Sequence, residues 1–316
     1  MQFLTLTLIK LFVLLNIVTN AEWANWRGPN MDGSSSAKNV PTKFSQTENI
    51  RWSIDMTGKA ASTPIISGGK VFITTTDKAK KELLAVAYDL KSGKEQWSEV
   101  VGKGLNQDNR SNYAGASPVS DGKHVVFFYG TGDMAVFSHD GKLRWKKNIQ
   151  EEYGKFYFLW TFSSSPIIHD GKIILQVLQR DTPVHPAQQG GGKQSSYILA
   201  LSLDEGKEIY KTPRPDEAKS ESKEAFSTPI IHELNGESQL LITGGDCITG
   251  HDPSTGKEIW RWGTWNPTKI GHWRLVPSPV AGNGVALACA PKGDPVYAVK
   301  LGKSGTLPNS SVSWKG

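Results

Sequence analysis

The chain has 316 residues, of which 38% are hydrophobic and 21% charged, so it can bury a sizeable core and shows no sign of disorder. Its 32 glycines and 11 tryptophans, with polar turns between short apolar runs, indicate an all-β protein. The formal net charge of +6 is too small an excess to indicate nucleic-acid binding.

The first 21 residues have the pattern of a targeting segment. Residues 11–18 form an apolar run that is too short to span a bilayer, and small or polar residues follow it up to Ala21. We predict a secretory signal peptide at 1–21, with an uncleaved anchor as the alternative. The protein is then expected to be secreted or periplasmic, without a transmembrane span, and residues 22–49 to form an extended N-terminal segment.

The two cysteines, Cys247 and Cys289, could pair in an oxidising compartment, but the sequence does not place them close together. No adjacent cysteine pair, CxxC or CxxCH occurs, which argues against a covalently attached haem and a zinc knuckle.

Two short markers recur along residues 50–316 and indicate an internal repeat. The first is a serine or threonine followed by proline, at Pro64, Pro118, Pro166, Pro229 and Pro279. The second is an aromatic residue that in most repeats follows a Gly-Lys turn, at Trp52, Trp97, Trp145, Tyr210, Trp260 and Trp314. The markers define repeats near 58–101, 114–149, 163–212, 225–262 and 276–316.

Each repeat reads as four short strands joined in order by tight turns, such as "TPIIS", "VFITTT", "LLAVAYDL" and "EQWSEVV" in the first. A radial array of such sheets is a β-propeller of four-stranded antiparallel blades. The proline marker is expected to open the innermost strand of each blade, where a missing N–H donor is tolerated. The aromatic marker falls on the outermost strand and is expected to pack against the next blade.

About five blades are present, and Trp52 resembles part of an outermost strand without a blade of its own. We therefore expect an unclosed ring, or a fragment of a longer protein.

The repeat resembles the pyrroloquinoline-quinone-like (PQQ-like) repeat of the quinoprotein alcohol dehydrogenase-like superfamily. The resemblance is carried by Ser117-Pro118, Gly122-Lys123, Leu199-Ala200-Leu201, Asp252 and Thr255-Gly256-Lys257-Glu258-Ile259-Trp260. The stretch "NWRGPNMDG", at 25–33, is similar to the opening of exported bacterial members. The resemblance implies seven or eight blades, so two or three are expected to be missing. Related proteins include quinone-dependent dehydrogenases and a lipoprotein that helps to assemble outer-membrane proteins.

In a four-stranded meander, successive connections alternate between two faces. The hairpin face carries the Gly-Lys turns and three His-Asp pairs, His139-Asp140, His169-Asp170 and His251-Asp252, which we interpret as turn chemistry and do not expect to converge. The loop face carries the connections between blades and between the second and third strands, which are long and rich in aromatic residues. The candidate ligand-binding residues on this face are Arg110, Asn112, Tyr113, Trp160, Arg180, His185, Phe226, His272, Trp273 and Arg274.

Two functions follow from these patterns. The first is a non-catalytic monomer in the cell envelope that binds an envelope protein, peptide or carbohydrate on the loop face, or serves as a scaffold, with no cofactor. The second is a PQQ-dependent oxidoreductase of the alcohol or sugar dehydrogenase type, which would need PQQ, Ca²⁺ and a carboxylate base, with part of its site in the missing blades. The sequence identifies no catalytic residue and no metal site.

Overall fold

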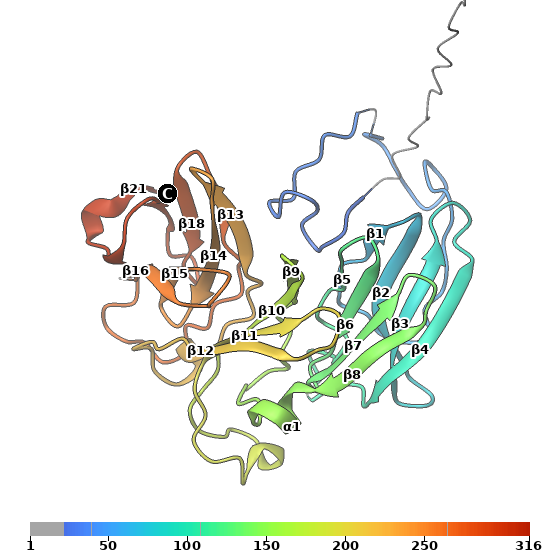
Figure 1. Ribbon diagram of the computed structural model, residues 1–316, viewed down its shortest axis with the longest axis horizontal. Helices are drawn as coiled ribbons and strands as arrows, with labels where there is room; N and C mark the ends of the chain where they lie inside the picture. Colours follow the sequence, from blue (N-terminus) through green and yellow to red (C-terminus); the bar gives the residue numbers. More distant parts are fainter. Residues whose placement is uncertain (1–21, 39, 108, 264) are drawn as a thin grey trace, which may run out of the picture.

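The computed structural model describes residues 22–316 except 39, 108 and 264 (Figure 1). The predicted signal peptide lies outside the described residues. Within them, five sheets follow one another round an arc from β1 to β21, each with four antiparallel strands in chain order, and β20 joins the fourth sheet as a fifth, parallel strand (Figure 1). The predicted all-β propeller of four-stranded blades is therefore confirmed.

The first blade consists of β1 (Ile65–Ser67), β2 (Lys70–Asp77), β3 (Glu82–Asp89) and β4 (Glu95–Lys103). The second consists of β5 (Val119–Ser120), β6 (His124–Phe128), β7 (Asp133–Ser138) and β8 (Leu143–Asn148), followed by the short helix α1 (Ile149–Tyr153). The third consists of β9 (Ile167–His169), β10 (Lys172–Val177), β11 (Tyr197–Ser202) and β12 (Glu208–Pro213). The 3-10 turns η1 (Pro186–Gln188) and η2 (Ser220–Lys223) precede β11 and follow β12.

The fourth blade consists of β13 (Ile230–Leu234), β14 (Glu237–Gly244), β15 (Cys247–His251) and β16 (Glu258–Trp262). The fifth consists of β17 (Val280–Gly282), β18 (Val285–Cys289), β19 (Val296–Lys300) and β21 (Val312–Lys315). Between β19 and β21 the chain forms β20 (Gly305–Thr306), which pairs in parallel with β16, and the 3-10 turn η3 (Asn309–Ser311). This excursion ties the fourth blade to the fifth at their outer edge.

The aromatic markers of the five repeats occupy one register position. Each lies opposite the third-strand residue that immediately precedes a β-bulge, as Trp97 lies opposite Ala87 and Trp145 opposite Val136. Tyr210, Trp260 and Trp314 have the same position in their blades. Trp52 differs, because it lies in a segment without strand structure.

Four of the aromatic markers dock on the third-to-fourth-strand turn of the next blade along the chain. The indole nitrogens of Trp52, Trp97 and Trp145 donate to the carbonyl oxygens of Leu90, His139 and Leu203, at 3.0, 3.0 and 2.8 Å. The Tyr210 hydroxyl donates to the Pro253 carbonyl oxygen at 3.1 Å. The turn glycines Gly93, Gly141, Gly206 and Gly256 leave room for these rings, since an added Cβ would lie 2.6 to 2.8 Å from them.

Trp260 and Trp314 depart from this pattern. Trp260 is buried between the fourth and fifth blades, beside Ala286 and Val299, and its indole nitrogen donates to Gln239 Oε1 at 2.9 Å. Trp314 is 50% exposed, and since it lies in the last described strand, its expected packing against a next blade stays a prediction.

The serine or threonine of each proline marker belongs to a chain of hydrogen bonds that we call the hydroxyl belt. Each hydroxyl oxygen accepts the backbone N–H of the equivalent residue in the preceding blade. From donor N–H to acceptor Oγ or Oγ1, the pairs are Thr63 to Ser117 at 2.9 Å, Ser117 to Ser165 at 2.9 Å, Ser165 to Thr228 at 3.0 Å and Thr228 to Ser278 at 2.8 Å. The proline that follows each of them directly precedes the innermost strand of its blade.

Residues 22–33 form a segment, here called the axial strap, that contacts the innermost strands of several blades. The backbone of Trp23 pairs with Ile66 of β1, and the Ser120 N–H of β5 donates to the Ala24 carbonyl oxygen at 2.9 Å. Arg27 Nη1 donates to the Pro279 carbonyl oxygen at 3.0 Å. The strap therefore connects the first, second and fifth blades, and Figure 1 shows its blue trace between β1 and β13.

The apolar core is continuous from blade to blade. Phe72 and Leu83 of the first blade share a buried cluster with Phe127 and Phe137 of the second, and similar clusters join the later blades. Both cysteines are free: Cys247 is buried and Cys289 is half-buried. Among the described residues, no helix is long and apolar enough to cross a membrane.

Candidate functional site

Several predicted loop-face residues meet around Trp160, in the loop between the second and third blades. The guanidinium carbons of Arg110 and Arg274 lie 5.0 and 5.6 Å from the centre of the Trp160 ring. The Trp160 indole nitrogen donates to Glu221 Oε1 at 3.1 Å, and Arg274 Nη1 donates to the same oxygen. We call these four residues the Trp160 cluster; each comes from a different blade connection, so four connections contribute to it.

A second ion pair fixes the backbone next to Trp160. Arg180 Nε donates to Glu224 Oε1, and the Leu159 N–H donates to Glu224 Oε2 at 3.1 Å. The Glu224 side chain is fully buried, and this burial raises the pKa of Glu224 to about 7 despite the opposing effect of Arg180. Both carboxylate oxygens are occupied by protein donors, so Glu224 acts on the position of the loop.

The carbonyl groups of the same stretch are held from the long insertion of the third blade. His185 Nε2 donates to the Leu159 carbonyl oxygen at 2.8 Å, so this ring nitrogen carries the proton. Gln188 Nε2 donates to the Phe158 carbonyl oxygen at 2.9 Å, and Gln188 Oε1 accepts the backbone N–H groups of Val184 and His185. Arg180 and His185 thus support Trp160 through its neighbours.

The other predicted residues lie round the cluster or apart from it. Phe226 packs on Phe158 with ring centres 5.6 Å apart, and the Trp273 N–H donates to Ser222 Oγ at 2.7 Å. His272 is exposed beside them. Asn112 and Tyr113 lie between the first and second blades. Asn112 Oδ1 accepts the Ala114 N–H at 2.9 Å, the Tyr113 backbone N–H donates to the Leu105 carbonyl oxygen at 2.9 Å, and the Tyr113 carbonyl oxygen accepts the Gly130 N–H at 2.9 Å.

Glu221 and Glu224 were not among the candidates, although they organise the site. They lie in the loop "DEAKSESKEAF", three residues apart around the turn η2. The sequence marks these two glutamates only by their spacing of three residues within this loop. Carboxylates in loops are more often solvated than buried, so this spacing did not single them out.

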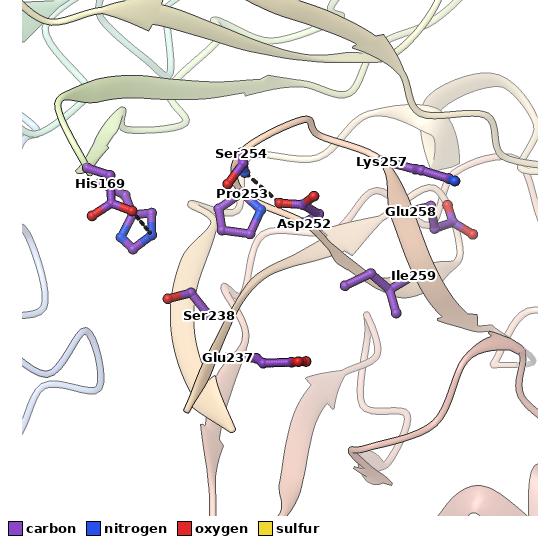
Figure 2. A pocket seen from close by; sticks show the side chains of 10 residues that line it. His169, Glu237, Ser238, Asp252, Pro253, Ser254, Lys257, Glu258 and Ile259 are labelled. Carbon is purple, nitrogen blue, oxygen red and sulfur yellow. Dashed lines mark hydrogen bonds and ion pairs between the residues drawn. The ribbon is translucent and has the colours of Figure 1, made fainter. Parts of the chain in front are cut away.

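The hairpin face carries the largest of the cavities described, about 640 Å³ between the third and fourth blades (Figure 2). His169 and Asp170 line it together with Asp252, Glu237 and Glu258. Two of the three His-Asp pairs thus contribute side chains to one cavity, which His251 does not line. It is correct that Asp252 serves its own turn, because it accepts the Ser254 N–H at 2.7 Å and the Thr255 hydroxyl at 3.0 Å. Glu258 is bound at both oxygens by Arg261, at 2.6 Å.

Comparisons with known proteins agree with this architecture. A family model described as "Outer membrane protein assembly factor BamB" matches residues 42–181. No curated protein matches the chain.

Three solved structures illustrate the likeness in fold. A europium-containing methanol dehydrogenase is 13% identical, with 88% of this chain and 56% of that chain covered and a TM-score of 0.59. A quinohemoprotein alcohol dehydrogenase from Comamonas testosteroni is 14% identical, with 78% and 42% covered and a TM-score of 0.51. BamB from Moraxella catarrhalis is 13% identical, with 84% and 63% covered and a TM-score of 0.49.

The chain spans less than two thirds of the length of each of these structures. At such low identities the likeness shows the fold, and it extends beyond the part that the family model matches. The predicted resemblance is confirmed for residues 42–181, which match the family model, and for the propeller fold, which the two dehydrogenases share over 88% and 78% of this chain.

Proposed function

We propose that this protein is a binding module of the cell envelope, and that its loop face holds a protein or peptide partner through the Trp160 cluster. Tryptophan and arginine are the side chains that most often dominate protein interfaces, because they offer a large apolar area together with directional donors. Arg110 is exposed and Trp160 half-buried, so both remain accessible on the loop face.

One observation carries the proposal: the acidic side chains of the site are used to build it. Glu221 accepts from both Trp160 and Arg274, and Glu224 accepts from Arg180 and the Leu159 N–H. A general base needs a carboxylate within hydrogen-bond reach of a substrate proton. These two carboxylates instead hold a tryptophan and two arginines in place, as a preformed contact surface requires.

The family match supports the envelope location, since its description names an outer-membrane assembly factor. An envelope scaffold would use the same surface, with the axial strap and the hydroxyl belt keeping the blades in fixed positions. Carbohydrate is a further ligand class that aromatic and polar loops can bind.

A PQQ-dependent oxidoreductase is the second candidate, favoured by the likeness in fold to two dehydrogenases and by the near-neutral pKa of Glu224. The described residues of the Trp160 region fit this cofactor poorly. PQQ carries several carboxylates, whereas Arg180 and Arg274 already pair with Glu224 and Glu221. Glu224 itself is fully buried and cannot meet a substrate in this arrangement.

Site-specific photocrosslinking in the native envelope tests the proposal. A photoreactive amino acid is placed at His272 on the loop face and, as a matched control, at Lys91 on the hairpin face. We expect a discrete protein adduct from position 272 alone, which is lost in Arg110→Glu and Trp160→Ala variants that keep the wild-type unfolding temperature. Equal adducts from both faces, or dye reduction by the purified protein after addition of PQQ and Ca²⁺, would overturn it.

A further inference from the structure

A separate cavity of about 490 Å³ lies on the loop face of the first blade, and none of the four residues of the Trp160 cluster lines it. It is enclosed by residues 56–59, by the loop-face end of β2 with Thr76 and Lys78, and by the loop that carries Asn112. Its volume is within the range of about 300 to 1,000 Å³ that small-molecule sites occupy. The neighbouring loop-face cavities are smaller, at about 200 and 160 Å³.

The wall formed by residues 56–59 is fastened to β2 by reciprocal hydrogen bonds. Thr57 Oγ1 donates to the Thr76 carbonyl oxygen at 3.1 Å, and Thr76 Oγ1 donates to the Lys59 carbonyl oxygen at 3.2 Å. Gly58 lies so close to β2 that an added Cβ would be 2.3 Å from the Thr76 carbonyl oxygen. The cavity is therefore preformed, because its wall cannot shift without breaking these contacts.

The opposite wall is fixed by Asn112. Its Oδ1 accepts the Ala114 N–H, and the Ala114 carbonyl oxygen accepts the Ala61 N–H at 3.1 Å. Because Oδ1 is used in this turn, the Asn112 side chain offers its Nδ2 donors to the cavity that it lines.

The charge of the lining is positive. Among the described lining residues, the charged side chains are Lys59 and Lys78, and neither forms an ion pair with a described carboxylate. Asp77, next to Lys78, accepts the backbone N–H groups of Ala79 and Lys80 at 2.9 Å and so serves its own turn. Met56 and Leu105 add apolar surface to the same lining.

We propose that this cavity binds a small organic anion, such as a sugar phosphate or sugar acid, whose phosphate or carboxylate group lies between Lys59 and Lys78. Asn112 Nδ2 donates to the same ligand, and Met56 and Leu105 contact its uncharged part. Lysine is a common phosphate-binding residue, and the exposed position of both ammonium groups makes the binding dependent on salt. The headgroup of an anionic lipid offers the same chemistry.

Calorimetric titration of the full chain at low salt tests the site with glucose 6-phosphate, glucuronate, inorganic phosphate and glucose. We expect saturable binding of the anions and none of glucose, with affinity at least about tenfold weaker in Lys59→Glu/Lys78→Glu. The matched control, Lys91→Glu/Lys142→Glu, changes the same net charge on the hairpin face and is expected to bind as the wild type does.

Asn112→Asp provides a test that leaves the turn intact, because aspartate keeps the acceptor for the Ala114 N–H and replaces the donor with a negative charge. It should weaken anion binding without lowering the unfolding temperature.

Vesicles of phosphatidylglycerol, compared with vesicles of phosphatidylcholine, distinguish a lipid headgroup from a free anion. Binding to the phosphatidylglycerol vesicles and to none of the small anions would also support the site, provided that the double lysine variant loses it. Absence of saturable binding to every probe, or equal binding by both double variants, would overturn it. Trp160→Ala should leave anion binding unchanged, which separates this site from the proposed partner surface.

Discussion

Trp97 of the first blade and Gly141 of the second form one contact: the indole covers the glycine, and an added Cβ would lie 2.8 Å from the ring. The Trp97 indole nitrogen donates to the carbonyl oxygen of His139 in the same turn. In four blades, the Gly-Lys turn and the aromatic marker therefore recur together because the turn receives the aromatic marker that precedes that blade in the chain.

Gly141→Ala should lower the free energy of unfolding by about 2–4 kcal/mol, from the strain of a positive φ and from displacement of Trp97. Gly122→Ala is the matched control, because Gly122 has nearly the same φ, +93° against +89°, and nothing within 4 Å of its added Cβ. It should lose only about 1 kcal/mol. Denaturant titration measures both, and equal losses would contradict the role of the docked ring.

The hydroxyl belt predicts a cost for removing one buried hydroxyl. Ser165→Ala leaves the buried Ser117 N–H without its acceptor, so the free energy of unfolding should fall by about 1–3 kcal/mol. Ser165→Thr retains a hydroxyl, as Thr228 does in the next blade, and should recover most of the loss. If alanine and threonine had the same effect in denaturant titration, packing rather than the hydrogen bond would account for it.

The axial strap predicts local protection from amide exchange. Gly28→Ala places a methyl group 2.6 Å from the Trp23 ring, whereas Gly33→Ala meets nothing within 4 Å at a similar positive φ. Exchange of the Ile66 and Ser120 amides, which donate to Trp23 and Ala24, should accelerate in the first variant and remain slow in the second. Unchanged exchange at both amides in Gly28→Ala would show that the strap does not depend on this close approach.

The raised pKa of Glu224 predicts a pH dependence of stability. Burial raises it from 4.5 to about 7, so between these values the folded protein holds a proton that the unfolded chain has released. The Glu224 contribution to the free energy of unfolding should therefore decrease as pH rises through this window. Denaturant titration from pH 4.5 to 7 measures the free energy of unfolding of the wild type and of Glu224→Gln. The difference between the two should decrease as the pH rises.

The fully exposed Glu217 provides the control for this experiment. Its hydrogen bond with Lys269 lowers the pKa of Glu217, so Glu217→Gln should not remove the decrease. If the free energy of unfolding of the wild type changed with pH in the same way as that of Glu224→Gln between pH 4.5 and 7, the result would contradict a buried Glu224 carboxyl that holds its proton in this range.

The architecture was predictable because its markers are local and repeated. Pro118 and Trp145 each mark a strand whose partners lie within the same repeat, so pattern alone placed them on the innermost and outermost strands. Contacts between segments that lie far apart in the sequence have no repeated local pattern by which they could be predicted. The pairing of Trp23 with Ile66 and the donation from Arg27 to Pro279 depend on how the blades curve round the axis.

The loop face was only partly predictable for the same reason. Aromatic and basic residues identified the region of Trp160, but the burial of Glu221 and Glu224 depends on the neighbouring loops and has no local sequence pattern. Likewise, His169 and Asp252 belong to different hairpins and line one cavity only because the third and fourth blades stand side by side.

The hydrogen bonds of the hydroxyl belt all have the same direction. In each, a backbone N–H of one blade donates to the hydroxyl oxygen of the next blade along the chain. A repeat such as 163–212 thus carries one donor for its successor and one acceptor for its predecessor. Duplication of a single repeat copies both this donor and this acceptor, so the new blade can form the same hydrogen bonds with its neighbours without a change in them. Head-to-tail joints of this kind provide a simple route by which propellers gain or lose blades during evolution.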